Sequence, residues 1–390
     1  MSPPRTVLYV HSSAGRYGAD RQLLLMASGL DPARYRPLVV LPELGALGRD
    51  LRDAGVEVHV RPLAVLRRAL MTPRGVAGVG AAWAADARAL GGLARSRRVA
   101  LVHTNTSVTL GGGAAARVAG VPHVWHVREI FSGFERWWPG LRRVVLSAAA
   151  IPCVSEATRA QFAGAHKAEL LHDGLPPIAP RPARAQARAA LGLRPDPNQR
   201  DTVVAVLGRI SAWKGQDVAV RALADPALAG RADVSLLVAG AAWQGEEQRE
   251  DDLRRLAQRL GVTERTRLLG FRTDVENVLG AADVVVVPST TPDPLPNAAL
   301  EAAAAGGCVV ASAHGGLPEI ITHEQTGVLV APGDPGALAA TLAELADDPA
   351  RRARLGAAAR QDVTTRFAPA HLLTAVQALY DRSVGDAGRV

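Results

Sequence analysis

The sequence predicts two consecutive α/β domains, each built on a parallel β-sheet with helices on its faces. Three observations support this prediction. The chain has 390 residues, whereas an ordinary single domain has about 100 to 200. Short β-branched runs alternate with Ala-, Leu- and Arg-rich runs of helical period. This alternation lapses once, in a proline-rich stretch between residues 176 and 200, and then resumes.

The predicted strands follow one another in regular order. In the first half they are Thr6–Val10, Pro37–Leu41, Glu57–Val60, Ala100–His103, His123–His126 and Ala150–Val154. In the second half they are Thr202–Leu207, Val234–Ala239, Arg267–Leu269, Asp283–Val287, Cys308–Ser312 and Val328–Val330. We expect a Rossmann-like domain at 1–175, a linker at 176–200, a second Rossmann-like domain at 201–365, and a helix at 366–390 that packs back on the first. Tandem domains of this kind generally bind ligands at the carboxyl ends of their strands.

Composition restricts the function classes. Apolar residues make up 48% and charged residues 21%, as in a globular protein with ample core material. The net charge of +8 suits phosphorylated ligands or anionic lipid, whereas zinc-finger spacing, a basic zipper and an RNP-like strand are all missing, so nucleic acid is not an expected partner. Cys153 and Cys308 lie in apolar runs, which favours buried thiols in a reducing compartment. With no signal-peptide pattern and no apolar run of about 18 residues, we expect a cytoplasmic protein.

The first segment with chemical content is the turn Gly208–Gly215, which follows the predicted strand Thr202–Leu207. It carries two cations, Arg209 and Lys214, between two glycines. Arg209 can fork two phosphate oxygens and Lys214 can place a point charge beside them. Both would neutralise charge that grows on a departing diphosphate.

The second segment is Ser289–Ala302, which follows the apolar strand Asp283–Val287. It places Asp293 and Glu301 eight positions apart across a loop and the start of a helix. Pro296 suits the first turn of that helix, whose free N–H groups attract phosphate or hydroxyl oxygens. We expect Glu301 to reach ribose hydroxyls and Asp293 to reach a sugar.

Taken together, these segments resemble the retaining glycosyltransferases of family four, which have the GT-B fold. That family typically shows G-R-x4-K-G, an acid-x7-acid pair, G-x-P-V-V-A-S and G-G-x-P-E in this order. The corresponding segments here are Gly208–Gly215, Asp293…Glu301, Gly307–Ser312 and Gly315–Glu319. Asp293 stands where the family usually has Glu, and Pro296 replaces the usual Gly after that acid.

The resemblance implies a fold, a reaction and a set of site residues. The fold would be two Rossmann-like βαβ domains that face each other across a deep cleft. The reaction would be retaining, metal-independent transfer of a sugar from a nucleoside diphosphate, UDP or GDP, to a hydroxyl, without a cofactor. We expect that acceptor to be a lipid-linked or cell-envelope glycan precursor, with a small natural product as the alternative. The implied catalytic residues are His126, Arg209, Lys214 and Asp293, and the implied donor-binding residues are Gly15, Gly18, Gly208, Arg209, Lys214, Phe271, Leu295, Pro296, Asn297 and Glu301.

The first half carries the looser part of the resemblance. The segment Gly15–Asp20 is similar to the family's glycine loop and following acid, near the donor phosphates and the acceptor. The segments beginning at His103 and His126 are similar to its cleft-facing histidine segments. Of these two histidines, His126 is the better candidate for the position near the transferred sugar.

Three other functions remain open. A dehydrogenase would use Gly111–Ala116, a loose match to G-x-G-x-x-A that lies several residues beyond its strand. A GT-B epimerase would act on a sugar nucleotide at the same place, and release of UDP during turnover would separate the two. A catalytically silent subunit would bind the donor without transferring or hydrolysing it.

Two segments mix aromatic or aliphatic residues with arginine in the manner of interfacial membrane segments. They are Arg61–Met71 and Phe131–Arg143, the latter including Phe134, Trp137 and Trp138. Ordinary packing explains these patterns equally well. The membrane hypothesis predicts peripheral contact with an anionic membrane at its inner face.

Overall fold

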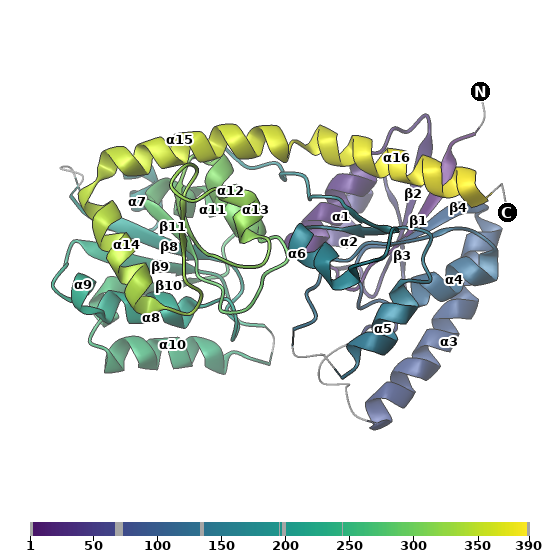
Figure 1. Ribbon diagram of the computed structural model, residues 1–390, viewed down its shortest axis with the longest axis horizontal. Helices are drawn as coiled ribbons and strands as arrows, with labels where there is room; N and C mark the ends of the chain where they lie inside the picture. Colours follow the sequence, from purple (N-terminus) through teal and green to yellow (C-terminus); the bar gives the residue numbers. More distant parts are fainter. Residues whose placement is uncertain are drawn as a thin grey trace. The chain divides into compact units, whose positions relative to one another are not determined.

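The computed structural model describes residues 3–66, 73–132, 136–194, 196, 200–243 and 245–387. The chain forms two compact units. The first contains Met1–Pro176 together with Phe367–Val390, and the second contains Pro177–Arg366. Figure 1 shows both units, coloured along the sequence.

The first unit is built on a five-stranded parallel sheet in the order β3-β2-β1-β4-β5. Its strands are β1 (Arg5–Val10), β2 (Tyr35–Leu41), β3 (Glu57–Val60), β4 (Val99–Thr104) and β5 (His123–Trp125). A small parallel pair, β6 (Ile151–Cys153) and β7 (Ala168–Leu170), follows. The helices are α1 (Gly18–Gly29), α2 (Gly45–Asp53), α3 (Pro73–Ser96), α4 (Gly111–Ala119), α5 (Trp138–Val145), α6 (Glu156–Arg159) and α16 (Pro369–Ala387).

The last helix, α16, belongs to the core of the first unit. Leu372, Val376, Leu379 and Tyr380 are buried in the same hydrophobic cluster as Leu23 of α1. Burial of these apolar side chains is what holds the helix on this unit. Figure 1 shows α16 alongside α1, at the end of the chain.

The glycines at the start of α4 serve close packing. A Cβ on Gly112 would lie 2.0 Å from Oγ1 of Thr104, and one on Gly113 would lie 3.1 Å from His123. On the neighbouring helix α3, a Cβ on Gly91 would lie 2.4 Å from the side chain of Val118. The Gly111–Ala116 run therefore lets a helix approach strand β4 and helix α3, and it is not a loop that wraps a dinucleotide.

The second unit is built on a six-stranded sheet in the order β10-β9-β8-β11-β12-β13, and every pairing is parallel. Its strands are β8 (Thr202–Leu207), β9 (Val234–Ala239), β10 (Thr266–Gly270), β11 (Val284–Val287), β12 (Cys308–Ser312) and β13 (Val328–Val330). The helices are α7 (Arg184–Ala190), α8 (Gln216–Ala224), α9 (Pro226–Ala229), α10 (Gln248–Arg259), α11 (Val275–Ala281), α12 (Asn297–Ala304), α13 (Leu317–Ile320), α14 (Pro335–Asp347) and α15 (Pro349–Arg366).

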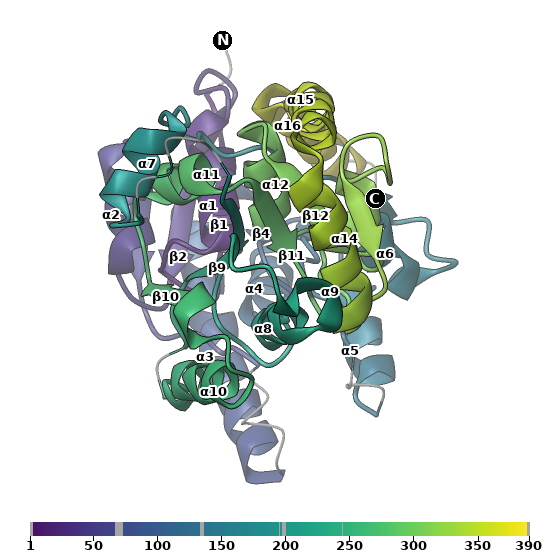
Figure 2. The same cartoon turned by 90° about the vertical axis from the view of Figure 1, so that its left-hand side faces the viewer.

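Helices cover both faces of this second sheet. One layer contains α8, α9, α10 and α14, and the other contains α7, α11, α12 and α15, as Figures 1 and 2 show. The apolar strands, such as Val284–Val287, are buried throughout because each face meets a helix layer. The first sheet is covered in the same way, because one buried cluster joins it to α1, α2 and α16 and another joins it to α3 and α4. Two such doubly covered parallel sheets constitute the GT-B fold.

The structure contains every strand predicted from the sequence, with ends that differ by at most two residues. The short strand β7 was not predicted, because Ala168–Leu170 offers no β-branched run. The proline-rich segment that we expected to link the domains belongs largely to the second unit. Arg184 of α7 bonds to Asp283 and Asp196, and α7 packs on α11, which explains its attachment there.

Cys153 and Cys308 are both buried free thiols. No helix among the described residues is long and apolar enough to cross a membrane.

Candidate active site

The turn after β8 brings Arg209 and Lys214 to the carboxyl edge of the second sheet. Gly208 and Gly215 have φ values of +124° and +74°, which side chains with a Cβ rarely adopt. A Cβ on Gly215 would also lie 1.8 Å from the carbonyl oxygen of Pro288, just beyond β11. The glycine therefore lets the cationic turn lie directly against the loop that carries Asp293.

Lys214 and Asp293 form an ion pair at this edge. Nζ of Lys214 donates to Oδ2 of Asp293 at 2.6 Å, and the two side chains are 23% and 6% exposed. Ser289 donates a longer hydrogen bond of 3.4 Å to the same carboxylate oxygen. The cationic turn and the loop that carries Asp293 therefore meet in one cluster, in which the buried carboxylate pairs with the partly exposed ammonium.

Gly315 and Gly316 pack against the backbone of the loop that carries Asp293. The Gly316 N–H donates to the carbonyl oxygen of Asp293 at 2.8 Å. A Cβ on Gly315 would lie 2.3 Å from that oxygen, and one on Gly316 would lie 2.0 Å from the carbonyl oxygen of Pro294. These glycines are therefore needed for close backbone contact, which fixes the position of Asp293.

Helix α12 starts immediately after this loop. Pro296 is the N-cap residue, one position before the first turn in which we expected it, and it makes no side-chain cap bond. Asn297 follows, and its buried Oδ1 and Nδ2 have no hydrogen-bond partner among the described residues. An unpaired buried amide at a helix N-terminus is a ready site for an oxygen-rich ligand.

The remaining predicted donor-binding residues differ in exposure. Leu295, in the loop before α12, is 7% exposed. Glu301 lies on α12 and is 8% exposed. Phe271 follows β10 and is 57% exposed, which leaves its ring available to a ligand.

Two tryptophans that we did not predict as site residues contact the cations. The guanidinium carbon of Arg209 lies 4.8 Å from the ring centre of Trp243, and Nζ of Lys214 lies 4.4 Å from the ring centre of Trp213. Trp213 immediately precedes Lys214 in the turn Gly208–Gly215, and this position in the motif could have identified it as a site residue. Trp243 follows a different strand, β9, and its proximity depends on the strand order.

In the first unit, His126 follows β5 and is fully buried. Neither of its ring nitrogens has a hydrogen-bond partner among the described residues. Burial and the nearby charge of Arg128 place its pKa well below the ordinary value, so the ring is neutral. A buried neutral imidazole without a partner can donate one hydrogen bond and accept another.

His103 lies beside it, with ring centres 5.4 Å apart. Its Nδ1 is 2.6 Å from the hydroxyl of Tyr380 on α16, which in turn donates to Tyr9 at 2.8 Å. Burial lowers the pKa of His103 to about 3. His103 is therefore held within the fold by the terminal helix, whereas His126 has no such anchor.

Hydrogen bonds to Asp20 hold the glycine loop that follows β1. Its carboxylate accepts bonds from Nε2 of His11 at 2.8 Å, from Ser13 at 2.5 Å and from the Tyr17 N–H at 2.9 Å. Burial alone would raise the pKa of Asp20, but these bonds and the charge of His11 lower it overall. Asp20 thus orders the loop that contains Gly15 and leads into α1 at Gly18.

The predicted residues therefore form two groups. Arg209, Lys214, Asp293 and Asn297 follow β8 and β11 at the carboxyl edge of the second sheet, and Phe271 follows the edge strand β10, two strands from β8. His126, His103 and the Gly15–Gly18 loop lie at the carboxyl edge of the first sheet. Among the residues that the structure describes, no three His, Cys, Asp or Glu side chains are grouped as metal ligands.

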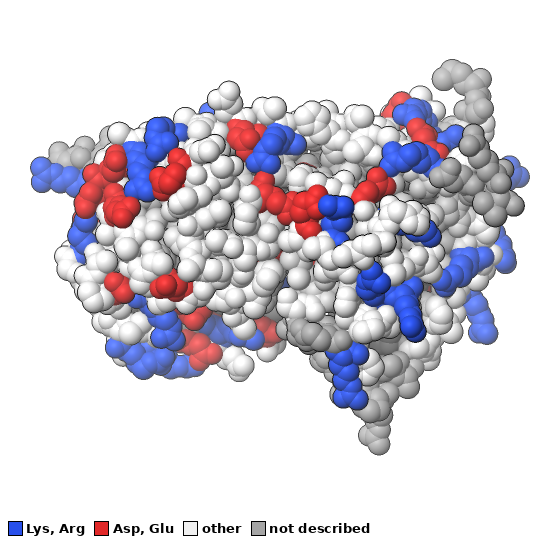
Figure 3. All heavy atoms as spheres, viewed as in Figure 1, with Lys and Arg blue, Asp and Glu red and all other residues white. Residues whose placement is uncertain are grey.

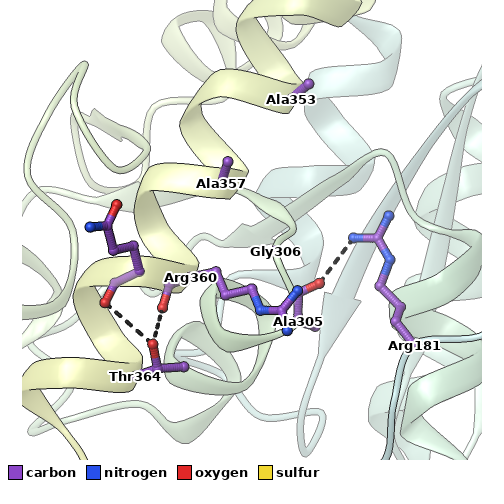
Figure 4. Close-up of a pocket in the computed structure, with 8 residues that line it drawn as sticks. Arg181, Ala305, Gly306, Ala353, Ala357, Arg360 and Thr364 are labelled. Carbon is purple, nitrogen blue, oxygen red and sulfur yellow. Dashed lines mark hydrogen bonds between the residues drawn. The ribbon is translucent and has the colours of Figure 1, made fainter.

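A separate hollow in the second unit lies at the other end of α12. Its lining includes Arg181, Arg360 and Thr364, together with Ala305 and Gly306 just beyond the helix. Figure 4 shows Arg181 pointing toward the carbonyl oxygen of Ala305, to which it donates at 3.4 Å. This contact caps the helix C-terminus, and none of the predicted site residues lines the hollow.

Comparisons with known proteins find glycosyltransferase relatives for both halves of the chain. Residues 194–362 match the family model described as "Glycosyl transferases group 1", and residues 17–172 match the "Glycosyl transferase 4-like domain". The D-inositol 3-phosphate glycosyltransferase of Mycobacterium marinum is 34% identical over 313 residues, 77% of this chain and 63% of that protein. Its counterpart in Mycolicibacterium smegmatis is 33% identical over 307 residues, 76% of this chain and 65% of that protein. The chain thus spans less than two thirds of the length of these curated relatives.

Solved structures give the same result. The Anabaena protein HepE, solved with UDP, superimposes with a TM-score of 0.79 at 25% identity, over 97% of this chain and 100% of that one. It has also been solved with UDP-glucose. Sucrose-phosphate synthase of Thermosynechococcus elongatus shares the fold, with a TM-score of 0.75 at 20% identity over 97% of this chain and 98% of that one.

The two doubly covered parallel sheets define a protein of the GT-B class. Within that class, the two family models together match most of the chain in the expected order. The chain belongs to the group 1 glycosyltransferases, also called family four.

Proposed function

We propose that the protein is a retaining glycosyltransferase that moves a sugar from a UDP-sugar to a hydroxyl acceptor. The observation that carries this proposal is the Lys214–Asp293 ion pair at the carboxyl edge of the second sheet, the edge that also carries Arg209 and the buried, unpaired amide of Asn297. UDP and UDP-glucose are bound in the HepE structures, which supports a UDP-sugar over a GDP-sugar here.

Each donor-binding side chain has a role that follows from its chemistry. Arg209 would fork two oxygens of the diphosphate, while Lys214 would turn part of its hydrogen bonding from Asp293 to a phosphate oxygen. Asn297 and the first N–H groups of α12 would meet further donor oxygens. Glu301 would accept hydrogen bonds from the ribose, and the exposed ring of Phe271 would contact the base.

The proposed reaction proceeds on one face of the sugar. The bond from the anomeric carbon to the leaving phosphate oxygen breaks, and the acceptor oxygen bonds to the same carbon. The acceptor proton passes to the departing phosphate oxygen. Arg209 and Lys214 stabilise the charge that grows on the diphosphate, which is the task of a metal ion in other transferases. Asp293 would orient sugar hydroxyls.

The acceptor is proposed to be a hydroxyl of a lipid-linked or cell-envelope glycan precursor. The curated relatives named for D-inositol 3-phosphate favour a phosphorylated polyol among small acceptors. A small natural product is the alternative that the sequence left open.

Peripheral contact with an anionic membrane is a further part of the proposal. Trp137 and Val144, at the two ends of α5, are 44% and 41% exposed, and Arg143 lies beside them. On the face drawn in Figure 3, the charged side chains of this part of the first unit are mostly Lys and Arg, set among uncharged residues. Phe131 and Trp138, by contrast, stack on each other at 4.7 Å, so half of the aromatic cluster is used in packing. In the Arg61–Met71 segment, Arg61 pairs with Asp86, and residues 67–72, like Phe134, lie outside the described residues.

Mass spectrometry after incubation with a panel of UDP-, GDP- and dTDP-sugars tests the proposed function without knowledge of the acceptor. We expect slow hydrolysis of one UDP-sugar to UDP and free sugar, and its loss in Arg209→Ala. A donor that binds without any turnover would indicate a silent subunit. Conversion to an isomeric sugar nucleotide without net release of UDP would indicate an epimerase.

A further inference from the structure

Both cations of the proposed donor site lie on the faces of tryptophan rings. Arg209 lies 4.8 Å from the centre of Trp243, and Lys214 lies 4.4 Å from the centre of Trp213. The chain has six tryptophans in all, and these two are the ones within the second unit. Each tryptophan of this unit therefore contacts one of the two cations that we propose to bind the diphosphate.

The Arg209 contact leaves the guanidinium able to bind phosphate. A cation–π contact uses the face of the guanidinium plane, whereas the N–H donors that fork a phosphate point outward within that plane. Trp243 can therefore cover one face of Arg209 without using its N–H donors. Trp243 is 45% exposed, so its ring lies at the surface.

The Lys214 contact complements the ion pair described above. The ammonium group has three donors, one of which points to Asp293 at 2.6 Å, so at least one remains for a phosphate oxygen even if another faces the indole ring. Trp213 thus restricts a flexible side chain and still leaves it a donor for phosphate.

The backbone at Trp213 is fixed independently of its ring. Its carbonyl oxygen accepts from the N–H of Thr290 at 2.8 Å and from the hydroxyl of Thr290 at 3.3 Å. Replacement of the indole therefore leaves the turn attached to the loop after β11, and a loss of binding would report on the ring.

We propose that Trp213 and Trp243 are positioning residues for the diphosphate of the donor, in that each orders its cation before the ligand arrives. This inference rests on the proposed function. Ordering in advance reduces the conformational entropy that a long cationic side chain loses on binding. The tryptophans act on the diphosphate, so their effect does not depend on the base or on the sugar.

Titration calorimetry with UDP, inorganic diphosphate and uridine tests the inference. We expect Trp243→Ala and Trp213→Ala each to weaken both UDP and inorganic diphosphate about three- to tenfold. The Phe variants, which keep an aromatic face, should stay within about twofold of the parent protein. Trp83→Ala is the matched control, because Trp83 is 38% exposed, lies in the first unit and donates only to the carbonyl oxygen of Leu110 among the described contacts. Its affinity for UDP should be unchanged.

Tryptophan fluorescence supplies a second readout that does not depend on the Ala variants folding. Inorganic diphosphate should change the emission of the parent protein, and the double variant Trp213→Phe/Trp243→Phe should lose that change. Unaltered affinities in both Ala variants would overturn the inference. So would a Trp243→Ala variant that weakens UDP and uridine but not inorganic diphosphate, because the ring would then serve the base.

A parallel titration separates this inference from the proposed function. If Arg209→Ala and Lys214→Ala bind UDP as the parent does, the diphosphate does not lie on these cations and the proposed function fails as stated. If those two variants lose affinity while the tryptophan variants do not, the positioning role alone is wrong.

Discussion

Replacement of Lys214 by Met should weaken both folding and donor binding, for reasons that can be separated. In the free protein the ammonium lies 2.6 Å from a carboxylate whose side chain is 6% exposed. Lys214→Met removes the positive charge, keeps a side chain of similar length, and leaves the buried Asp293 without its counterion.

The magnitude follows from the burial of the two partners. Two unit charges about 4 Å apart attract by about 4 kcal/mol at an effective dielectric constant of 20. Loss of one partner of a fully buried pair costs about 3 to 5 kcal/mol. Because Lys214 is 23% exposed and water screens part of the attraction, we expect Lys214→Met to lower the free energy of unfolding by about 2 to 3 kcal/mol.

The double variant Lys214→Met/Asp293→Asn separates folding from function. It removes both charges, so its stability should return to within about 1 kcal/mol of the parent. Its affinity for UDP should stay at least about tenfold weaker, as in Lys214→Met alone, because a charged hydrogen bond to phosphate is still missing.

The measurement has to resolve one unit at a time, because a chain of two units need not unfold in one step. Hydrogen exchange in increasing urea, read by mass spectrometry on peptides from 200–243, reports on the second unit. A Lys214→Met variant as stable as the parent would refute the energetic argument. A double variant that binds UDP like the parent would show that Lys214 serves only to neutralise Asp293.

Three further predictions concern other parts of the molecule. Burial lowers the pKa of His103 and His123 to about 3, so below pH 6.5 the unfolded chain binds protons that the folded chain does not. Urea unfolding of the first unit should therefore show about 2 kcal/mol of stability lost per histidine between pH 7 and pH 5, and equal stability at both values would contradict this. Gly215→Ala should cost about 3 kcal/mol or more in thermal unfolding, because of its positive φ and the carbonyl oxygen 1.8 Å from the new Cβ. At Gly230 an added Cβ meets nothing within 4 Å, so Gly230→Ala should cost about 1 kcal/mol at most. Equal losses of stability in the two variants would contradict this prediction. Flotation should recover the protein with acidic liposomes at low salt and less with Trp137→Ala, whereas equal, negligible recovery with neutral and acidic lipid would leave packing as the explanation for α5.

The fold could be predicted from the sequence because the apolar strand runs and the helical period of the segments between them are both strong. Buried parallel strands such as Val284–Val287 are continuous apolar runs, and each is followed by an amphipathic helix. The short strand β7 lacked that signal, and the Pro-rich segment did not reveal that α7 packs on α11. Attachment of α7 depends on long-range ion pairs such as Arg184 with Asp283, which no local pattern encodes.

The site was predictable where it depends on motifs, and less so where it depends on strand order. Arg209 and Lys214 stand in one turn, so their proximity follows from the sequence. The ion pair between Lys214 and Asp293 required β8 and β11 to be neighbours in the sheet. Trp243 reaches Arg209 because β9 adjoins β8 on the other side. Neither neighbour relation can be read from spacing, since parallel strands are joined by crossovers of variable length.

The most direct test of the central claim is a crystal structure of this protein with UDP. We predict that the β-phosphate lies within hydrogen-bond distance, about 3 Å, of the Arg209 guanidinium and of Nζ of Lys214, with the ribose toward Glu301. A diphosphate bound elsewhere, with Lys214 still paired to Asp293 alone, would contradict the account.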